Sequence, residues 1–271
     1  MKFDSNRAWK EAAAAVSANR EVLFAIAGVF ILLPSLAFGL LFPQPVASPE
    51  LTPEQAGTAM LTFYQDAMPW LLPMAVLQAV GSLSLLALFT DRRRPTVGDA
   101  IRLGATGLLP YIGVQLLVGL GLGAIAVLVL ALASATGLVA LSVVLGIAVA
   151  IAAIYIAVKT SLTAPVIMVE GVRNPIVALR RSWALTKGNS ARIAVFYALL
   201  VLVFVIAISV ISALFGIAAA MIAGAEGARV VGVIVSSAMG ATMTLYLVAV
   251  VAAIHRQLAG PSPEAVGATF E

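Results

Sequence analysis

The sequence contains no cysteine and a single histidine, His255, and only 10% of its 271 residues are charged. The absence of cysteine excludes a disulfide framework, a thiolate metal site and a dithiol redox motif. A lone histidine without a clustered pair of carboxylates also excludes an ordinary zinc site or a metal-dependent phosphodiesterase site. We therefore expect no cofactor and no bound metal.

Apolar residues make up 62% of the chain, and the mean hydropathy is +1.09. The charged fraction is well below the roughly 25% that is typical of soluble domains, so we expect an integral membrane protein. The net charge of +4 could suggest a nucleic-acid partner. However, the basic residues flank apolar runs instead of covering one soluble face, which indicates contact with anionic lipids and no nucleic acid.

Six apolar stretches are each long enough to cross the hydrocarbon core, which takes about 20 helical residues. They cover approximately residues 22–42, 70–89, 105–133, 138–169, 193–222 and 230–254. This pattern predicts an all-α integral membrane protein with six transmembrane helices. We expect a single domain over residues 1–260, with an uncleaved first helix. Residues 261–271 are small, polar and proline-containing, which predicts a disordered tail.

The basic residues are distributed unevenly between the gaps that separate these stretches. Fifteen of the sixteen lie in or beside the gaps on one side of the membrane, and Arg229 is the exception. Cytoplasmic loops of membrane proteins carry such an excess of lysine and arginine. The sequence therefore predicts a multi-pass protein of the bacterial cytoplasmic (inner) membrane with both termini in the cytoplasm.

Short amphipathic segments precede the first, third and fifth apolar stretches. The first begins near Ser5, which we expect to cap the helix, and the second covers residues 95–104. The third begins at Asn174 with Pro175 in the first helical position, and Gly188 ends it. This alternation predicts three repeats of an interfacial helix followed by a transmembrane hairpin.

Small residues four positions apart occur in several stretches, as in Gly119 with Gly123 and in the series Gly232, Ser236 and Gly240. Such small faces let helix backbones approach closely in lipid, so we expect helix–helix contacts there. The run that contains Gly119 is not a nucleotide-binding loop, because no strand precedes it. Pro34 is expected to kink the first helix.

Polar groups are scarce inside the apolar stretches, and no acidic residue lies near the middle of any of them. This excludes the intramembrane carboxylates that relay protons in many pumps. Gln78 and Gln115 are expected to form hydrogen bonds across helices, or else to line a polar cavity. For Lys159 we expect a side chain that snorkels toward the head groups, with pairing to a carboxylate or to a lipid phosphate as alternatives.

The basic segment over residues 170–192 is a candidate lipid-binding helix. At 100° per residue, Arg173, Arg180 and Lys187 would share one edge beside Trp183. A basic edge next to an apolar one suits an anionic head group above an acyl chain. The alternative is that these residues only fix the orientation during insertion.

The same segment resembles a known bacterial family. TAPVIMVEG at residues 163–171 and RSWALTKG at residues 181–188 are similar to the motif of the glycerophosphoryl diester phosphodiesterase membrane domain, and of the related uncharacterised six-helix inner-membrane family of the YciC type. The matching residues include Glu170, Pro175, Ser182, Trp183 and Gly188.

What this resemblance implies is a membrane module that is sometimes joined to a soluble phosphodiesterase. The present chain has no room for that catalytic barrel, so the enzyme name is not transferred. Structural roles suffice for the motif: Pro175 starts a helix, Gly188 ends it and Trp183 anchors it at the interface. Glu170 could pair with Arg173 or Arg181.

Three functions are compatible with the sequence. The first is a non-catalytic, lipid-associated accessory or lipid-handling module, with a homo-oligomer or another membrane protein as a further partner. The second is a transporter or channel for a small solute, which would need a continuous polar cavity. The third is a membrane-embedded lipid hydrolase that uses His255 with Ser182 or Ser190, although no nucleophile elbow accompanies these residues.

Overall fold

The computed structural model describes residues 2–43, 45, 52–90 and 96–260, which are helical with short connections and contain no strand. The tail predicted over residues 261–271 lies outside them. Within this part of the chain, five segments are long and apolar enough to cross a membrane, which confirms the all-α membrane class. They are Arg20–Leu41, Glu54–Thr90, Val97–Ala135, Val139–Val169 and Ser190–Ala259.

The chain begins with an amphipathic helix, α1 (Ser5–Ala18), as the sequence predicts. Its N-cap is Asp4, because Asp4 has extended backbone angles and its Oδ1 accepts a hydrogen bond from the backbone N of Arg7 at 3.0 Å. The expectation that Ser5 caps this helix is therefore wrong by one residue. Its buried positions are spaced four residues apart, at Ala8, Ala12 and Val16.

The first apolar segment consists of three consecutive pieces, α2 (Arg20–Ala27), the π-helix η1 (Gly28–Leu32) and α3 (Leu33–Leu41). The π-helical turn lies directly before Pro34. Proline lacks the N–H that would continue the α-helical pattern, so a local change of helix type at this point is expected. The structure therefore shows a π-helical turn before Pro34, and the predicted kink stays a prediction.

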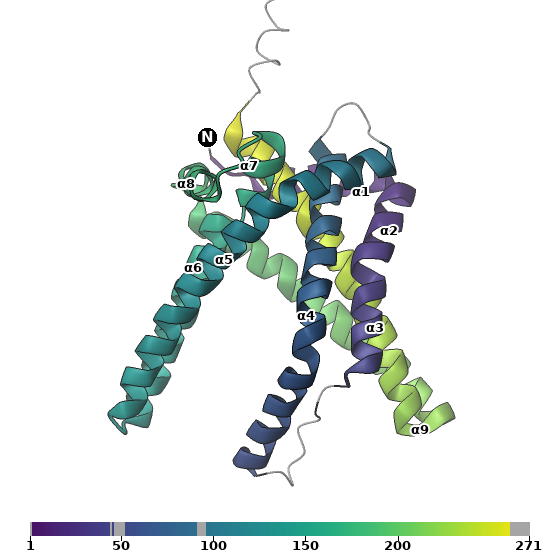
Figure 1. The fold of residues 1–271 in the computed structure, drawn as a ribbon. Coiled ribbons are helices and arrows are strands. Elements are labelled where there is room, and N and C mark those ends of the chain that lie inside the picture. Colours follow the sequence, from purple (N-terminus) through teal and green to yellow (C-terminus); the bar gives the residue numbers. More distant parts are fainter. Residues whose placement is uncertain (1, 44, 46–51, 91–95, 261–271) are drawn as a thin grey trace, which may run out of the picture.

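Two of the following helices are longer than the sequence predicts. Helix α4 (Pro53–Thr90) begins at a capping box, in which the Gln55 backbone N donates to Thr52 Oγ1 at 3.3 Å, and it continues without a break into the apolar segment. Helix α5 (Val97–Ala135) likewise includes most of the segment predicted as a separate interfacial helix over residues 95–104. The first turns of α5 cross the top of the molecule before the helix turns down (Figure 1).

Three shorter helices follow, namely α6 (Val139–Thr160), α7 (Thr163–Val169) and α8 (Pro175–Thr186). The predicted limits of α8 are confirmed. Asn174 Oδ1 accepts hydrogen bonds from the backbone N of Ile176 and of Val177, and Pro175 occupies the first helical position.

The last helical element, α9 (Ser190–Ala259), reverses direction at Ala223 and Gly224, where the backbone is not helical. Gly224 has φ +69°, a conformation that glycine adopts without steric cost. A straight helix of 70 residues would be about 105 Å long. Instead, Asn189 before α9 accepts a hydrogen bond from Phe3, and Gln257 near its end accepts one from Asp4, so the two limbs return to the same place.

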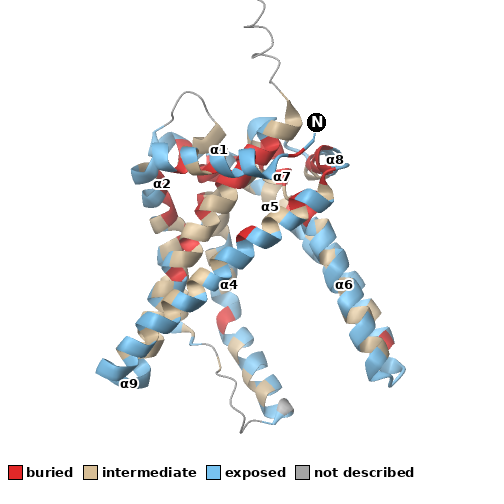
Figure 2. Cartoon of the chain, turned by 180° about the vertical axis from the view of Figure 1, so that it is seen from behind, coloured by how far each residue is buried: buried red, intermediate tan, exposed pale blue. Residues whose placement is uncertain are grey.

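The short helices lie together at one end of the molecule, and the long limbs extend away from it (Figure 1). We call α1, α7 and α8 the helical cap. Buried residues gather in and below the cap, whereas the far ends of α4, α6 and α9 are mostly exposed (Figure 2). The hydrophobic core includes Leu23, Leu85, Ile167, Ile193 and Ile254. The apolar limbs therefore have few protein neighbours at their far ends.

The predicted small-residue contacts are wrong within the described chain. A Cβ built on Gly119, Gly123, Gly232 or Gly240 would have no atom within 4 Å, so these positions face open space. Close approach occurs instead at the top of α5, where a Cβ on Gly104 would lie 2.8 Å from the backbone N of Ser84 in α4.

The two glutamines of the apolar segments differ. Gln78 of α4 donates from Nε2 to Ser35 Oγ of α3 at 3.2 Å, which confirms the predicted hydrogen bond across helices. Gln115 lies on an exposed face of α5. A single interhelical hydrogen bond of this kind contributes about 1 kcal/mol in a membrane protein.

Replacement of Gly104 by alanine should destabilise the contact between α4 and α5. The added Cβ would meet backbone atoms of Ser84, which cannot rotate away, so we expect the variant to lose about 1–3 kcal/mol of stability. The measurement is thermal unfolding in detergent. The matched control is Gly119→Ala, which should be neutral or slightly stabilising because alanine favours helix and meets no neighbour. Equal melting temperatures in both variants would contradict the packing described here.

Candidate functional site

Glu170 connects three elements of the molecule. It follows the last residue of α7, its Oε2 lies 2.8 Å from Arg181 Nε of α8, and its Oε1 lies 3.1 Å from His255 Nε2 of α9. Partial burial raises the pKa of Glu170, but the hydrogen bonds from Arg181 and His255 outweigh burial and hold the pKa below its usual value. The carboxyl group is therefore ionised at neutral pH.

The sequence offered two partners for Glu170, and the structure selects between them. Arg181 forms the ion pair, whereas Arg173 Nη1 donates to the backbone O of Thr106 in α5 at 2.8 Å. The contact with His255 was not predicted. The only signal in the sequence was that both residues lie at the same end of their apolar stretches, and 85 residues separate them.

Ser182 is buried, and its hydroxyl group both donates and accepts a hydrogen bond that joins two helical segments. Its Oγ donates to the backbone O of Lys159 at 2.7 Å and accepts from the backbone N of Leu162 at 3.2 Å. It thereby fixes α8 against the break between α6 and α7. Ser190 Oγ donates to the backbone O of Thr186 at 2.9 Å. Among the described residues neither hydroxyl forms a hydrogen bond with His255, so the Ser–His arrangement is not assembled.

Lys159 is covered, with a relative exposure of 4%. Its ammonium group lies 5.6 Å from the ring centre of Tyr155 and 5.3 Å from that of Trp183, which are cation–π distances. The ammonium group thus reaches the interfacial helix α8, and the expectation that it snorkels toward the head groups stays a prediction. Trp183 also packs edge-on against Tyr155 with ring centres 5.8 Å apart. This lysine therefore helps to hold α8 against α6.

The basic residues of the candidate lipid helix do not share one helical edge. Helix α8 ends at Thr186, so Arg173 precedes the helix and Lys187 follows it, and the angle of 100° per residue does not apply to them. Arg180 and Lys187 are exposed, and neither has an ion pair with any residue in the described ranges. Both cations remain available to a ligand, whereas Arg173 already binds a backbone carbonyl.

A pocket of about 340 Å³ lies beside the cap, between the start of the chain and the first limb of α9. Its walls are apolar and include Phe3, Val195 and Leu199, and Arg192 and Ser5 contribute the polar side chains. An arginine above an apolar wall can hold a phosphate while an acyl chain covers the wall. The sequence patterns gave no indication of this pocket.

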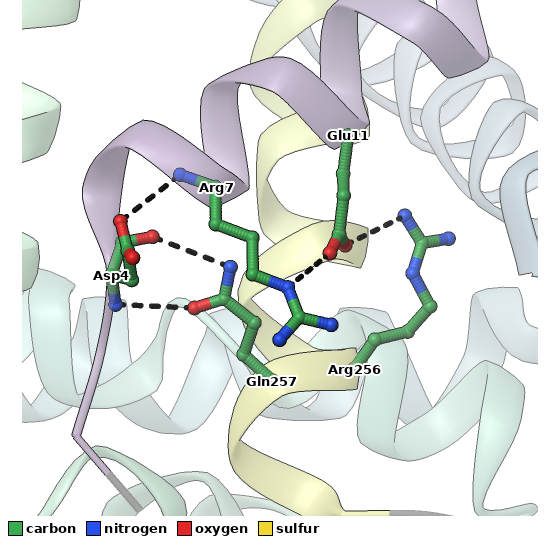
Figure 3. A network of polar contacts seen from close by, with 5 residues as sticks. All are labelled: Asp4, Arg7, Glu11, Arg256 and Gln257. Atoms are coloured by element: carbon green, nitrogen blue, oxygen red, sulfur yellow. Dashed lines mark hydrogen bonds and ion pairs between the residues drawn. The ribbon is translucent and has the colours of Figure 1, made fainter.

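The end of α9 also holds α1 in place (Figure 3). Gln257 forms two hydrogen bonds with the backbone of Asp4, and Glu11 lies 2.7 Å from Arg7 Nε and 3.7 Å from Arg256 Nη2. Arg256 also donates from Nη1 to the last turn of α4, at the backbone O of Phe89. These contacts join α1 to the ends of α9 and α4. In the residues with described positions, no group of three or more metal-binding side chains comes together.

Comparison with protein-family models, with curated proteins and with solved structures gave no match. The resemblance of residues 163–188 to the glycerophosphoryl diester phosphodiesterase membrane domain therefore remains a prediction from the motif.

Loss of the Glu170 carboxylate should weaken the cap. We expect Glu170→Gln to lower the free energy of unfolding by about 1–2 kcal/mol at neutral pH, because two charge-assisted hydrogen bonds at a partly exposed group are lost. The measurement is chemical unfolding in detergent. The matched control is Glu21→Gln, because Glu21 is exposed and has no ion pair with another described residue.

The same variant gives a pH test. The folded-state pKa of Glu170 is lowered, so its stabilising contribution is present above the unfolded-state value of about 4.3 and is lost as the pH falls through the folded-state value. The difference in stability between the native chain and Glu170→Gln should therefore shrink as the pH is lowered from about 7 to about 3. A difference that grows on acidification would contradict this assignment.

Proposed function

We propose that this chain is a six-span protein of the bacterial cytoplasmic membrane with both termini in the cytoplasm. The two antiparallel limbs of α9 supply the fifth and sixth crossings. The cap then lies at the cytoplasmic interface, since most of the basic residues with described positions lie in it or beside it, and the three hairpins extend through the bilayer. An interfacial segment precedes each hairpin, namely α1, the first turns of α5, and α8, which supports the repeat arrangement.

The proposed function is that of a lipid-associated accessory or lipid-handling module without catalytic activity of its own. The observation that carries it is the set of exposed cations at the cap, Arg180, Lys187 and Arg192, next to exposed apolar side chains such as Ile176 and Trp183. Anionic lipid head groups attract such cations by roughly 1 kcal/mol per residue near the surface. Apolar neighbours let the acyl chains stay in contact with the protein.

The orientation can be tested with single cysteines, because the native sequence has none to interfere. We expect Arg180→Cys to react with a membrane-impermeant maleimide only in inside-out vesicles, and Glu54→Cys only in intact spheroplasts. Both positions are exposed in the structure, so each should label quickly in detergent, which serves as the control. Labelling of position 54 from the cytoplasmic side would refute the proposed orientation.

Head-group binding can be tested with charge-removing variants. The triple variant Arg180/Lys187/Arg192→Gln should lose most of its preference for phosphatidylglycerol over phosphatidylcholine in nanodiscs, as measured by native mass spectrometry of retained lipids. In the native protein this preference should weaken as salt is raised, because these cations are exposed.

The matched control is Arg173→Gln, in which the removed cation already binds the Thr106 carbonyl. We expect Arg173→Gln to lower the stability of the protein and to leave its preference for phosphatidylglycerol largely unchanged. If the triple variant folds, inserts correctly and keeps its full preference for anionic lipid, the cap cations serve only to orient the chain.

A further inference from the structure

Lys159, in the last turn of α6, is a covered cation without a counter-ion among the residues that the structure describes. Its ammonium group lies against the rings of Tyr155 and Trp183, but it forms no hydrogen bond or ion pair with any described residue. A lysine ammonium has three N–H donors, and a buried charge is costly unless it is paired. The three donors of this side chain are therefore open to an acceptor from outside the described chain.

The ammonium group is accessible from the surface of the molecule. The buried polar atoms that lack a partner in the described chain belong to Tyr197, Ser212 and Arg229, and Lys159 Nζ is not one of them. Because Nζ also lacks a hydrogen-bond partner, it is the accessible tip of an otherwise covered side chain. Tyr155 and Trp183 on either side of it are each about half exposed. An oxygen atom of a ligand can therefore reach Nζ between the two rings.

The position of Lys159 along α6 corresponds to the depth of lipid phosphates. Helix α6 begins at Val139, directly after the short connection from α5, and runs up to the cap (Figure 1). Lys159 lies 20 residues after Val139, which is about 30 Å at 1.5 Å per residue. The hydrocarbon core is also about 30 Å thick. If the α5–α6 connection lies at one edge of this core, Lys159 lies at the other.

An apolar column leads along α6 to this cation. Ile147, Ile151, Tyr155 and Lys159 are four residues apart, so they lie on successive turns of nearly the same face. The first three are exposed in the structure. An acyl chain can cover this column while the phosphate above it meets Lys159.

The charge of the site favours an anionic phospholipid over other occupants. A free phosphate ion would leave the apolar column uncovered, and an apolar helix would bring no anion to Lys159. Phosphatidylcholine brings a phosphate together with a second cation. Phosphatidylglycerol carries the phosphate charge alone, so it can neutralise the unpaired ammonium group and cover the column at the same time.

We propose that one phosphatidylglycerol molecule binds at the junction of α6 and α8, with a phosphate oxygen accepting a hydrogen bond from Lys159 Nζ between Tyr155 and Trp183. One acyl chain lies along Ile147 and Ile151. The inference rests on the membrane placement and the lipid class proposed above. It adds a single defined site that does not use the exposed cations Arg180, Lys187 and Arg192.

The fluorescence of Trp183 can test this site, because Trp183 packs directly against Lys159. The chain has two other tryptophans, Trp9 and Trp70, and both are replaced by phenylalanine to keep a ring at each position. The full chain is placed in phosphatidylcholine bilayers that contain an increasing fraction of phosphatidylglycerol with bromine on its acyl chain, which quenches nearby tryptophan. We expect quenching above the level that the bulk fraction gives. The excess should persist in about 1 M salt, because a covered ion pair is screened less than an exposed one.

Lys159→Met removes the charge and keeps an unbranched side chain between the rings. It should lower the preference of the Trp183 site for phosphatidylglycerol about fivefold. Lys159→Arg keeps the charge and should stay within about twofold of the native value. The matched control is Lys10→Met, which removes the same charge from an exposed position of α1 and should leave the quenching in about 1 M salt unchanged.

Three results would overturn the proposal. The first is quenching in the unsubstituted site that follows the bulk fraction, which needs no Lys159 variant and stays decisive if Lys159→Met fails to fold. The second is excess quenching that disappears in high salt or survives in Lys159→Met. The third is loss of the excess on addition of inorganic phosphate, but not of chloride at equal ionic strength, which would assign Lys159 to a soluble anion.

The outcomes also separate this site from the function proposed above. The triple variant Arg180/Lys187/Arg192→Gln should keep the salt-resistant quenching of Trp183 even where it loses its salt-sensitive lipid preference. Loss of the Lys159 signal alone would leave the proposal for the exposed cations standing. If no brominated lipid quenches Trp183, α8 does not lie at the membrane, which would refute both proposals.

Discussion

Three consecutive side chains at the end of α9 hold the rest of the molecule together. His255 binds the Glu170 carboxylate between α7 and α8, Arg256 binds Glu11 of α1 and the last turn of α4, and Gln257 binds the backbone before α1. Successive residues of a helix point in different directions, about 100° apart, so a single turn can contact three separate elements. The position of the cap therefore depends on where α9 ends, and the reversal of α9 brings that end back to the cap.

The concentration of contacts at the cap end of the molecule follows from the lipid that surrounds the apolar helices. In lipid there is no hydrophobic force that drives apolar helices together, so polar contacts and close packing must hold them. The cap supplies the polar contacts, and the top of α5 supplies the close packing, as at Gly104 against Ser84. The far parts of α6 and α9 remain exposed apolar surfaces that acyl chains can solvate. A splayed arrangement with a rigid end is the expected result.

The sequence predicted the features that depend on local chemistry. The apolar runs and the start of α8, with Asn174 as its N-cap and Pro175 in its first position, arise from residues close together in the chain. It did not predict features that depend on distant parts. His255 pairs with Glu170 across 85 positions, and no period or motif encodes that distance. The spacing of small residues was ambiguous for a similar reason. Gly240 faces open space, and the same spacing would occur where a second helix packs against the first.

The motif in residues 163–188 can be explained contact by contact without a substrate. Glu170 ties α7 to α8 and α9, Ser182 fixes α8 to the α6–α7 break, and Trp183 covers Lys159. Gly188, with φ +80°, lets the chain turn from α8 into α9. These motif residues thus hold α8 in place, and Arg180 and Lys187 lie on and directly after this helix. These contacts account for the motif residues through their structural roles in the cap, so the motif alone does not assign a chemical activity.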